Sequence, residues 1–182
     1  MIYPLPALLV TCGKDVEEYN MLTAAWTGTI CSDPAMCYVS IRPERYSHAI
    51  IERNMAFTLN LTNRALARAT DWCGVRSGRD CNKWKEMGLT PVAGVTVDAP
   101  YIAEAPVSIE CAVRDIMRLG THDMFIAQVM NVIVDDRYLD PDTGALDLQA
   151  ADLITYCHGQ YYTLGEALGH FGWTVRKRGT KQ

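Results

Sequence analysis

The clearest potential for chemistry lies in Ser40, Arg42 and Ser47, because two hydroxyls and a guanidinium placed close together can hold an anionic group. Ser40 and Arg42 share the polar face of an expected strand over Ala35–Pro43, where the alternate residues are small or apolar. Ser47 stands directly before the sequence HAIIER, so we predict that it is the N-cap of a helix. The free N–H groups of that helix end, together with Arg45, predict a phosphate site; an ordinary capped helix with solvated arginines is the alternative.

The common nucleotide-binding signatures are missing from the sequence. It has no GxxxxGK[ST] motif, and the glycines Gly165, Gly169 and Gly172 follow the spacing GxxxGxxG without the preceding strand of a dinucleotide-binding motif. No Ser-His-Asp order favours nucleophilic catalysis. A nucleotide phosphate would therefore need another device, and the helix end at Ser47 is the best candidate.

Short strands separated by turns are expected along most of the chain. Alternating or apolar runs predict strands at Ala7–Thr11, Leu22–Ile30, Ala35–Pro43, Met55–Leu61, Val107–Leu119 and Met124–Asp135. A helix over Arg64–Thr70 is predicted, with Asn63 as its cap, followed by a long polar loop over Asp71–Lys83. Asp80 is predicted to cap a further short helix that ends at Gly88. Many short strands with few helices favour a barrel over a parallel sheet.

Two of these segments carry features that a ligand could use. The loop Gly120–Asp123 is predicted to connect two strands as a hairpin with His122 at its tip, a position where histidine is usually solvated. The small residues within Leu22–Ile30 would let a flat ligand approach the backbone, although a tightly packed barrel seam would also favour them.

The composition is that of a soluble globular protein. Its 182 residues are enough for one domain, predicted to span residues 1–182, and 49% of them are hydrophobic and 21% charged. The net charge of −4 argues against nucleic-acid binding by bulk electrostatics. No apolar run approaches the length of a membrane span, and the N-terminus lacks the basic start of a signal peptide.

The seven cysteines favour reduced thiols and a cytoplasmic location. Their number is odd and no CxxC pair occurs, so the spacing of a zinc site is missing and no metal site is predicted. Cys12, Cys31, Cys37 and Cys111 lie in apolar or strand-like runs and are predicted to be buried, whereas Cys73 lies in the polar loop.

Five segments carry a further pattern: NMLTAAWTGT at Asn20–Thr29, SIRPERYSHAII at Ser40–Ile51, CGVRSGRD at Cys73–Asp80, GTHDMF at Gly120–Phe125 and YTLGEALG at Tyr162–Gly169. Together and in this order they resemble the flavin reductase-like family, and more narrowly the flavoredoxin branch of the FMN-binding split barrels. The resemblance spans nearly the whole chain. The sequence departs from it at Cys81-Asn82, where many members have Val-Asp, and at Ala127-Gln128, where Gly-Glu is common, so the nicotinamide site is less well defined than the flavin site.

The resemblance implies a mainly β fold, a β-barrel with flanking helices, that binds FMN. The phosphate would be held by Ser40, Arg42, Tyr46 and Ser47. The ring and the ribityl chain would be lined by Asn20, Trp26 and Thr27. Lys83 would reach the pyrimidine side, Tyr161 or Tyr162 would cover the remaining edge, and His122 would stand at the ring face where a hydride donor docks. Without the family, Trp26 could equally well be a core residue, and Lys83 would be expected at the surface.

The activity implied by the resemblance is hydride transfer from NAD(P)H to FMN, followed by delivery of electrons to an acceptor. Members are typically homodimers, and the acceptor would be a redox partner protein or a small molecule. Three alternatives stay open: an FMN electron-transfer protein reduced by a partner protein, a non-catalytic flavin or haem binder, and a zinc hydrolase built on Cys157, His158 and His170.

Overall fold

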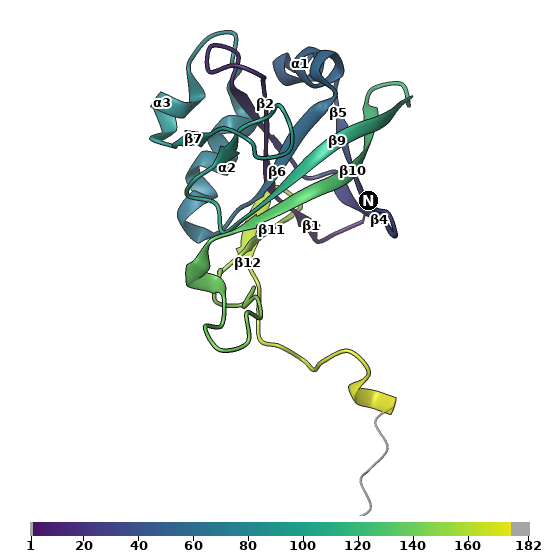
Figure 1. Ribbon diagram of the computed structural model, residues 1–182, viewed down its shortest axis with the longest axis vertical. Coiled ribbons are helices and arrows are strands. Elements are labelled where there is room, and N and C mark those ends of the chain that lie inside the picture. Colours follow the sequence, from purple (N-terminus) through teal and green to yellow (C-terminus); the bar gives the residue numbers. More distant parts are fainter. Residues whose placement is uncertain (1, 176–182) are drawn as a thin grey trace, which may run out of the picture.

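The computed structural model describes residues 2–175 and is built mainly of β-strands, with helices packed around them (Figure 1). Seven strands form one antiparallel sheet in the order β3-β2-β6-β9-β10-β5-β4. Their bounds are β2 (Leu8–Cys12), β3 (Asn20–Ala24), β4 (Thr27–Ser32), β5 (Ala35–Ile41), β6 (Ala56–Leu61), β9 (Val107–Arg118) and β10 (Asp123–Val134). The expected mainly β fold is thereby confirmed.

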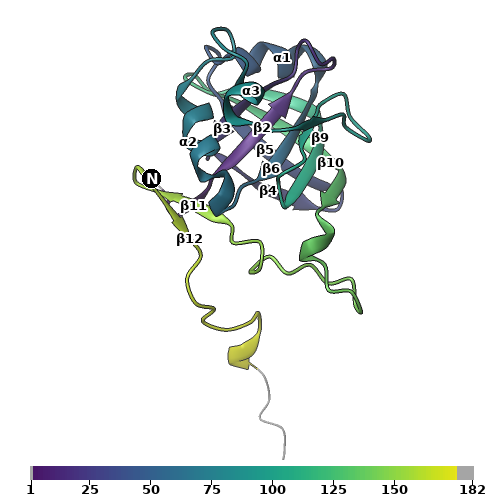
Figure 2. The ribbon, with the colours of Figure 1, turned by 90° about the vertical axis from the view of Figure 1, so that its left-hand side faces the viewer.

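The two edge strands of this sheet are consecutive in the chain. Only Ala25 and Trp26 join β3 to β4, although five other strands lie between them in the sheet order. The sheet must therefore curl until its edges approach each other at this link, and Figure 2 shows the strands wrapped around a common interior. The N–H of Ser40 in β5 donates to the carbonyl of Trp26 at 2.8 Å, which holds the link against the sheet. We call the place where β3, β4 and β5 meet the seam.

Apolar residues fill both sides of the sheet near β2. Successive side chains of β2 point to opposite faces of the sheet. Val10 points into the interior and belongs to the same cluster as Phe57 and Phe125, whereas Leu9 points outward and belongs to a second cluster with Trp84. Phe57 and Phe125 are fully buried, and burial of such a side chain contributes about 1.5–3 kcal/mol. The interior cluster therefore fixes the curvature of the sheet, and the outer cluster attaches the helices.

Three helices cover the sheet: α1 (Tyr46–Asn54), α2 (Ala67–Val75) and α3 (Lys83–Met87). Helix α1 lies across one end of the barrel, and α2 and α3 pack beside β3 (Figure 1). Helix α1 begins after Arg45, which provides no side-chain cap, and ends at Met55 in the left-handed conformation. The prediction that Ser47 is the N-cap is wrong, because Ser47 lies in the first helical turn and its hydroxyl accepts a hydrogen bond from Asn20.

Smaller elements complete the described chain. A three-stranded sheet contains β1 (Leu5–Pro6), β11 (Ile154–Cys157) and β12 (Gln160–Thr163), and a two-stranded sheet contains β7 (Pro91–Val92) and β8 (Tyr101–Ile102). Short 3-10 helices occupy Arg64–Leu66, Asp136–Tyr138 and Trp173–Val175. None of the helices within residues 2–175 is long and apolar enough to cross a membrane.

Several predicted boundaries need correction. The single strand expected over Leu22–Ile30 is interrupted at Ala25 and Trp26, where the chain crosses the seam. The loop expected over Asp71–Lys83 is helical in its first part, because α2 continues to Val75. Asn63 caps its helical segment as predicted, with its side chain accepting from the N–H of Leu66.

The cap of α3 and the burial of two cysteines also differ from expectation. Asn82 rather than Asp80 caps α3, which ends at Gly88 as predicted. Cys73 is fully buried because α2 turns it toward the outer apolar cluster, whereas Cys31 on the edge strand β4 is only half-buried.

The chain beyond β12 extends away from the barrel (Figures 1 and 2). It carries five large apolar side chains that are largely exposed: Leu164, Leu168, Phe171, Trp173 and Val175. Leu168 is 94% exposed. An apolar segment of this kind is costly to leave in water, so it is a candidate contact surface.

Candidate functional site

Two adjoining cavities open at the seam. The seam cavity, of 340 Å³, is lined by Leu22–Trp26, Ser40, Arg42, His122, Tyr156 and Tyr161, among others. The basic cavity, of 550 Å³, is lined by Asn20, Arg42, Arg45, Tyr46, Ser47, Arg76, Gly78 and Lys83, among others. Because Leu22, Arg42, Arg45 and Val75 line both, the two cavities lie side by side, and we call the pair the groove.

An aromatic pair borders the seam cavity. The rings of Trp26 and His122 lie with their centroids 4.4 Å apart at an interplanar angle of 35°. Trp26 is 43% exposed and therefore does not belong to the core. His122 comes from the β9–β10 connection, where it directly precedes β10 rather than standing at the tip of the turn, since its carbonyl accepts from the N–H of Leu119 at 3.0 Å. Segments far apart in the sequence thus meet in this stack.

The surroundings of His122 favour its neutral form. Burial lowers the pKa of the imidazole, and the nearby Arg42 guanidinium lowers it further, while Glu44 acts in the opposite direction. The Nδ1 atom lies 3.1 Å from the hydroxyl of Thr121. At neutral pH His122 is therefore an uncharged ring that stacks on Trp26 and retains a nitrogen for hydrogen bonding.

The basic cavity lies at the N-terminal end of α1. Arg45, Tyr46 and Ser47 line it, and no side chain caps the helix, so the N–H groups of Tyr46 and Ser47 are available to an anion, while the N–H of His48 donates to the carbonyl of Arg45 at 2.9 Å. Ser47 is 1% exposed, and its Oγ accepts from Asn20 Nδ2 at 2.7 Å. The lining contains Arg42, Arg45, Arg76 and Lys83 but only one carboxylate, that of Glu44. The charge and the helix dipole both favour an anionic group here.

Lys83 is almost fully buried, which contradicts its default reading as a surface lysine. Lys83 is 4% exposed, and its Nζ donates to the carbonyls of Met21 and Cys73, both at 2.8 Å. Burial lowers the pKa of this ammonium group. Lys83 lines the basic cavity together with Ser47, so its position is at the same end as the phosphate candidates.

The remaining predicted residues divide between the cavities. Ser40 lines the seam cavity and Tyr46 the basic cavity, where the guanidinium of Arg79 lies 5.7 Å from its ring. Thr27 lines neither cavity. Its hydroxyl donates to the carbonyl of Tyr38 at 2.5 Å. Tyr161 lines the seam cavity. Burial raises the pKa of Tyr161 to about 12, and Asp71 contributes to the same shift.

Sequence reasoning missed three residues of the groove. Arg76 and Gly78 belong to the quoted CGVRSGRD segment, and its two arginines could have been read as further phosphate ligands. A Cβ on Gly78 would lie 2.1 Å from Asn20 Oδ1, so only glycine lets this loop pack on the cavity wall. Tyr156, the third, carried no local signal because it reaches the groove from β11.

Comparisons with known proteins agree with this fold. A family model described as a flavin reductase like domain matches residues 1–165. The flavoredoxin of Desulfovibrio vulgaris (Miyazaki F) is 35% identical, with 97% of this chain and 95% of that chain covered and a TM-score of 0.89. An FMN-binding protein from Thermus thermophilus is 24% identical, with 92% and 90% covered and a TM-score of 0.79, which supports the fold alone. An uncharacterised protein of Pyrococcus abyssi is 32% identical over 130 residues, which are 71% of this chain and 74% of that protein.

Proposed function

The chain belongs to the flavin reductase-like family and has the fold of the FMN-binding split barrels, and from this premise we propose that it is an FMN-dependent oxidoreductase. It takes a hydride from NAD(P)H and passes the electrons to an acceptor. The observation that carries the proposal is the groove, in which an uncapped, cationic helix end adjoins a cavity of small and aromatic residues.

The basic cavity fits the phosphate of FMN. A phosphate dianion would meet the N–H groups of Tyr46 and Ser47 and the guanidinium groups of Arg42 and Arg45, and each charge-assisted hydrogen bond contributes about 1.5–3 kcal/mol. Ser47 and Tyr46 add hydroxyls, and Asn20 orients Ser47. We propose that Lys83 acts at this end of the groove, since it lines the basic cavity and not the seam cavity.

The seam cavity fits a flat ring. Thr23, Ala24 and Ala25 have small side chains, so a planar group can lie against the backbone at the link between β3 and β4. Ser40 lies on the wall between this cavity and the phosphate end, and Tyr161 is proposed to cover the outer edge of the ring. Thr27 acts indirectly, because its bond to the carbonyl of Tyr38 fixes the start of β4 beside the cavity.

FMN, when bound, supplies the two-electron acceptor that receives the hydride. The protein supplies position and access. Trp26, which is 43% exposed, and the half-buried His122 border the seam cavity, and we propose that a hydride donor approaches along this pair. Because His122 is neutral at pH 7, it adds no second cation beside Arg42, and its free ring nitrogen can orient the donor.

A second candidate function is that of an FMN electron carrier reduced by a partner protein. It is favoured by the likeness to the flavoredoxin of Desulfovibrio vulgaris, at 35% identity over nearly the whole chain. In this case Trp26 and His122 would lie at the contact with the redox partner. The two functions differ in whether NADH or NADPH alone reduces the bound flavin.

We further propose that the protein is a homodimer. The described chain leaves Leu168 and Phe171 exposed on the C-terminal extension, and the half-exposed Ile30 and Met117 lie on the edge strand β4 and on β9. A symmetric pair would cover such surfaces on both copies at once.

The deciding experiment is an absorption spectrum of the purified protein, before and after anaerobic addition of NADH and then of NADPH. We expect flavin bands close to one FMN per chain that are lost promptly with one of the two nucleotides. Bands lost only with dithionite would favour the electron carrier. A colourless protein that takes up no added FMN would overturn both functions.

A further inference from the structure

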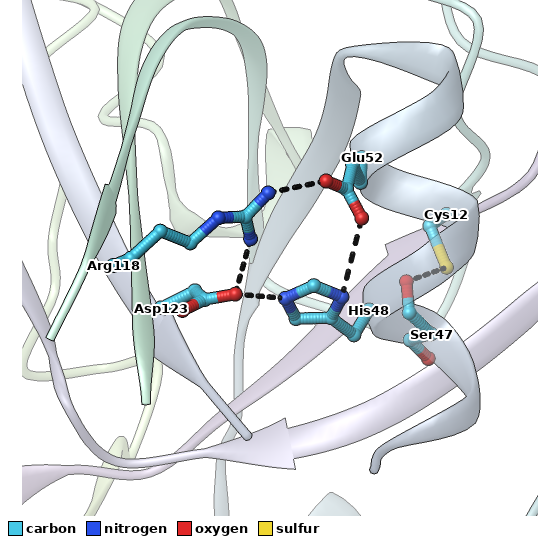
Figure 3. Close-up of polar contacts among 6 residues, drawn as sticks. All are labelled: Cys12, Ser47, His48, Glu52, Arg118 and Asp123. Atoms are coloured by element: carbon cyan, nitrogen blue, oxygen red, sulfur yellow. Dashed lines mark hydrogen bonds and ion pairs between the residues drawn. The ribbon is translucent and has the colours of Figure 1, made fainter. Parts of the chain in front are cut away.

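A closed cluster of four charged or titratable side chains lies between α1 and the β9–β10 hairpin (Figure 3). His48 Nε2 lies 2.8 Å from Asp123 Oδ2, and both side chains are only 6% exposed. Arg118 pairs with Asp123 and with Glu52, and Glu52 Oε2 lies 3.7 Å from His48 Nδ1. Burial alone would raise the pKa of Asp123, but the hydrogen bonds from His48 and Arg118 hold it below its usual range.

The cluster joins two elements that carry opposite ends of the groove. His48 directly follows Ser47 in the first turn of α1, and Asp123 directly follows His122 at the start of β10. Asp123 is also the pairing partner of Ile41 in β5, the residue between Ser40 and Arg42. Within residues 2–175, the side-chain hydrogen bonds from α1 to the β9–β10 hairpin all come from this cluster. It therefore connects the basic cavity to the seam cavity.

Stability alone does not explain why such a cluster is present. Placing the Asp123 carboxylate and the His48 imidazole in the interior costs desolvation energy, and packed apolar residues of similar volume usually serve stability as well or better. The cluster instead holds the His48 ring in one orientation. Both ring nitrogens of His48 face carboxylate oxygens, and the Phe125 ring packs edge-on against the imidazole, with the ring centroids 5.0 Å apart. An apolar contact could slide, whereas this arrangement fixes α1 and β10 in one relative position.

We propose that His48 and Asp123 are positioning residues, which set the distance between the phosphate-binding end of α1 and the stacked His122 beside the ring. The inference rests on the proposed function for its catalytic meaning, but the position of His122 is measurable without flavin. When the pair is broken, Ser47 keeps its hydrogen bond from Asn20 and Arg45 keeps its bond to the carbonyl of Gly74, so phosphate binding is retained while His122 loses its fixed place on Trp26.

The flavin-free test is the NMR signal of His122 in His48→Gln and Asp123→Asn. An indole 4.4 Å away shifts the His122 ring protons by its ring current, and Trp26→Ala gives the value without that ring. We expect the signal to move toward the Trp26→Ala value in both variants. The matched control is Asp135→Asn, which breaks the Asp135–Arg137 pair at the far end of β10 and should leave the signal unchanged.

The flavin-bound test compares affinity with rate in the same variants. We expect the FMN dissociation constant to stay within about threefold, while the rate of flavin reduction by NAD(P)H falls about tenfold to a hundredfold, since a displacement near 1 Å costs this much in rate. A loss of FMN affinity equal to the loss of rate would overturn the positioning role.

Two further results separate the positioning role from a failure of a variant to fold and from a failure of the proposed function. If His48→Gln fails to fold, Glu52→Gln and Arg118→Lys weaken the cluster from its exposed side and should move the His122 signal in the same direction. An unchanged His122 signal in every folded variant would overturn the inference. If wild-type protein binds no FMN, the proposed function fails, while the flavin-free result still decides whether the cluster positions His122.

Discussion

The basic cavity and the seam cavity are both lined by Arg42 but differ in the kinds of residue that make up the rest of their lining. The basic cavity combines a helix end with cationic side chains that are anchored by hydrogen bonds, as Lys83 is to two carbonyls. The seam cavity is lined mainly by small residues, tyrosines and the Trp26–His122 pair. The first is suited to binding an anion, and the second to controlling access to a ring. Substitutions in the two should therefore separate affinity from rate.

The largest expected effect comes from the seam cavity. In His122→Ala the Trp26 ring loses its stacking partner, so the donor is no longer oriented, and we expect flavin reduction by NAD(P)H to slow about a hundredfold. Stopped-flow absorbance measures the rate, and equilibrium titration should show an FMN dissociation constant close to wild type. An unchanged rate would remove His122 from the reaction and favour reduction by a partner protein.

Arg42→Ala tests the basic cavity. Loss of one charge-assisted hydrogen bond to phosphate costs about 2 kcal/mol, so we expect FMN to bind about thirtyfold more weakly. Titration of FMN fluorescence measures this, and riboflavin, which lacks the phosphate, should lose much less affinity. Arg137→Ala, which removes an exposed guanidinium distant from the groove, is the control. Equal losses for FMN and riboflavin would contradict a phosphate role for Arg42.

Gly78→Ala tests the basic cavity in a different way, because it displaces the cavity wall and leaves every charged side chain in place. The added Cβ would meet Asn20 Oδ1 at 2.1 Å and Tyr46 Cδ1 at 3.0 Å, so the loop that carries Arg76 must shift. Overpacking of this kind costs about 1–3 kcal/mol, and we expect FMN affinity to fall about tenfold. Gly165→Ala, where the Cβ meets nothing within 4 Å, should bind FMN as wild type does. Equal affinities in the two variants would show that the loop does not form the site.

The smallest expected effect is a pH dependence of stability. Because the folded pKa of His122 lies below its ordinary value of 6.5, the unfolded chain binds more protons in the window just below pH 6.5, and stability must rise with pH there. Urea unfolding at pH 5.5 and 7.5 should show a smaller pH difference for His122→Asn than for wild type. A pH difference as large in the variant would contradict the lowered pKa.

Local patterns in the sequence predicted the strands well because alternation is visible residue by residue. In β5, Cys37, Val39 and Ile41 are buried as expected, while Tyr38 and Ser40 are half-buried. The break between β3 and β4 was not predictable, because Ala24–Trp26 continues an apolar run and only pairing with distant strands interrupts it.

The site was predicted as a set of residues but not as a geometry. Ser47 was read as a cap, yet its hydroxyl is used by Asn20, a partner that lies 27 positions earlier in the sequence. Lys83 carries no local sign of burial, since its two carbonyl partners come from β3 and α2. His48 and Asp123 are 75 positions apart, and no spacing rule connects them. Long-range contacts decide each of these cases.

The two-residue link between opposite edges of the sheet has a consequence for folding kinetics. The link holds the adjoining ends of β3 and β4 together from the start, but the sheet closes only after the strands between them, from β2 through β9 and β10 to β5, have paired, and several of these pairings are distant in sequence. Such non-local closure is slow compared with helix formation. The seam therefore acquires its native geometry late in folding, and a ligand bound there reports completion of the whole sheet.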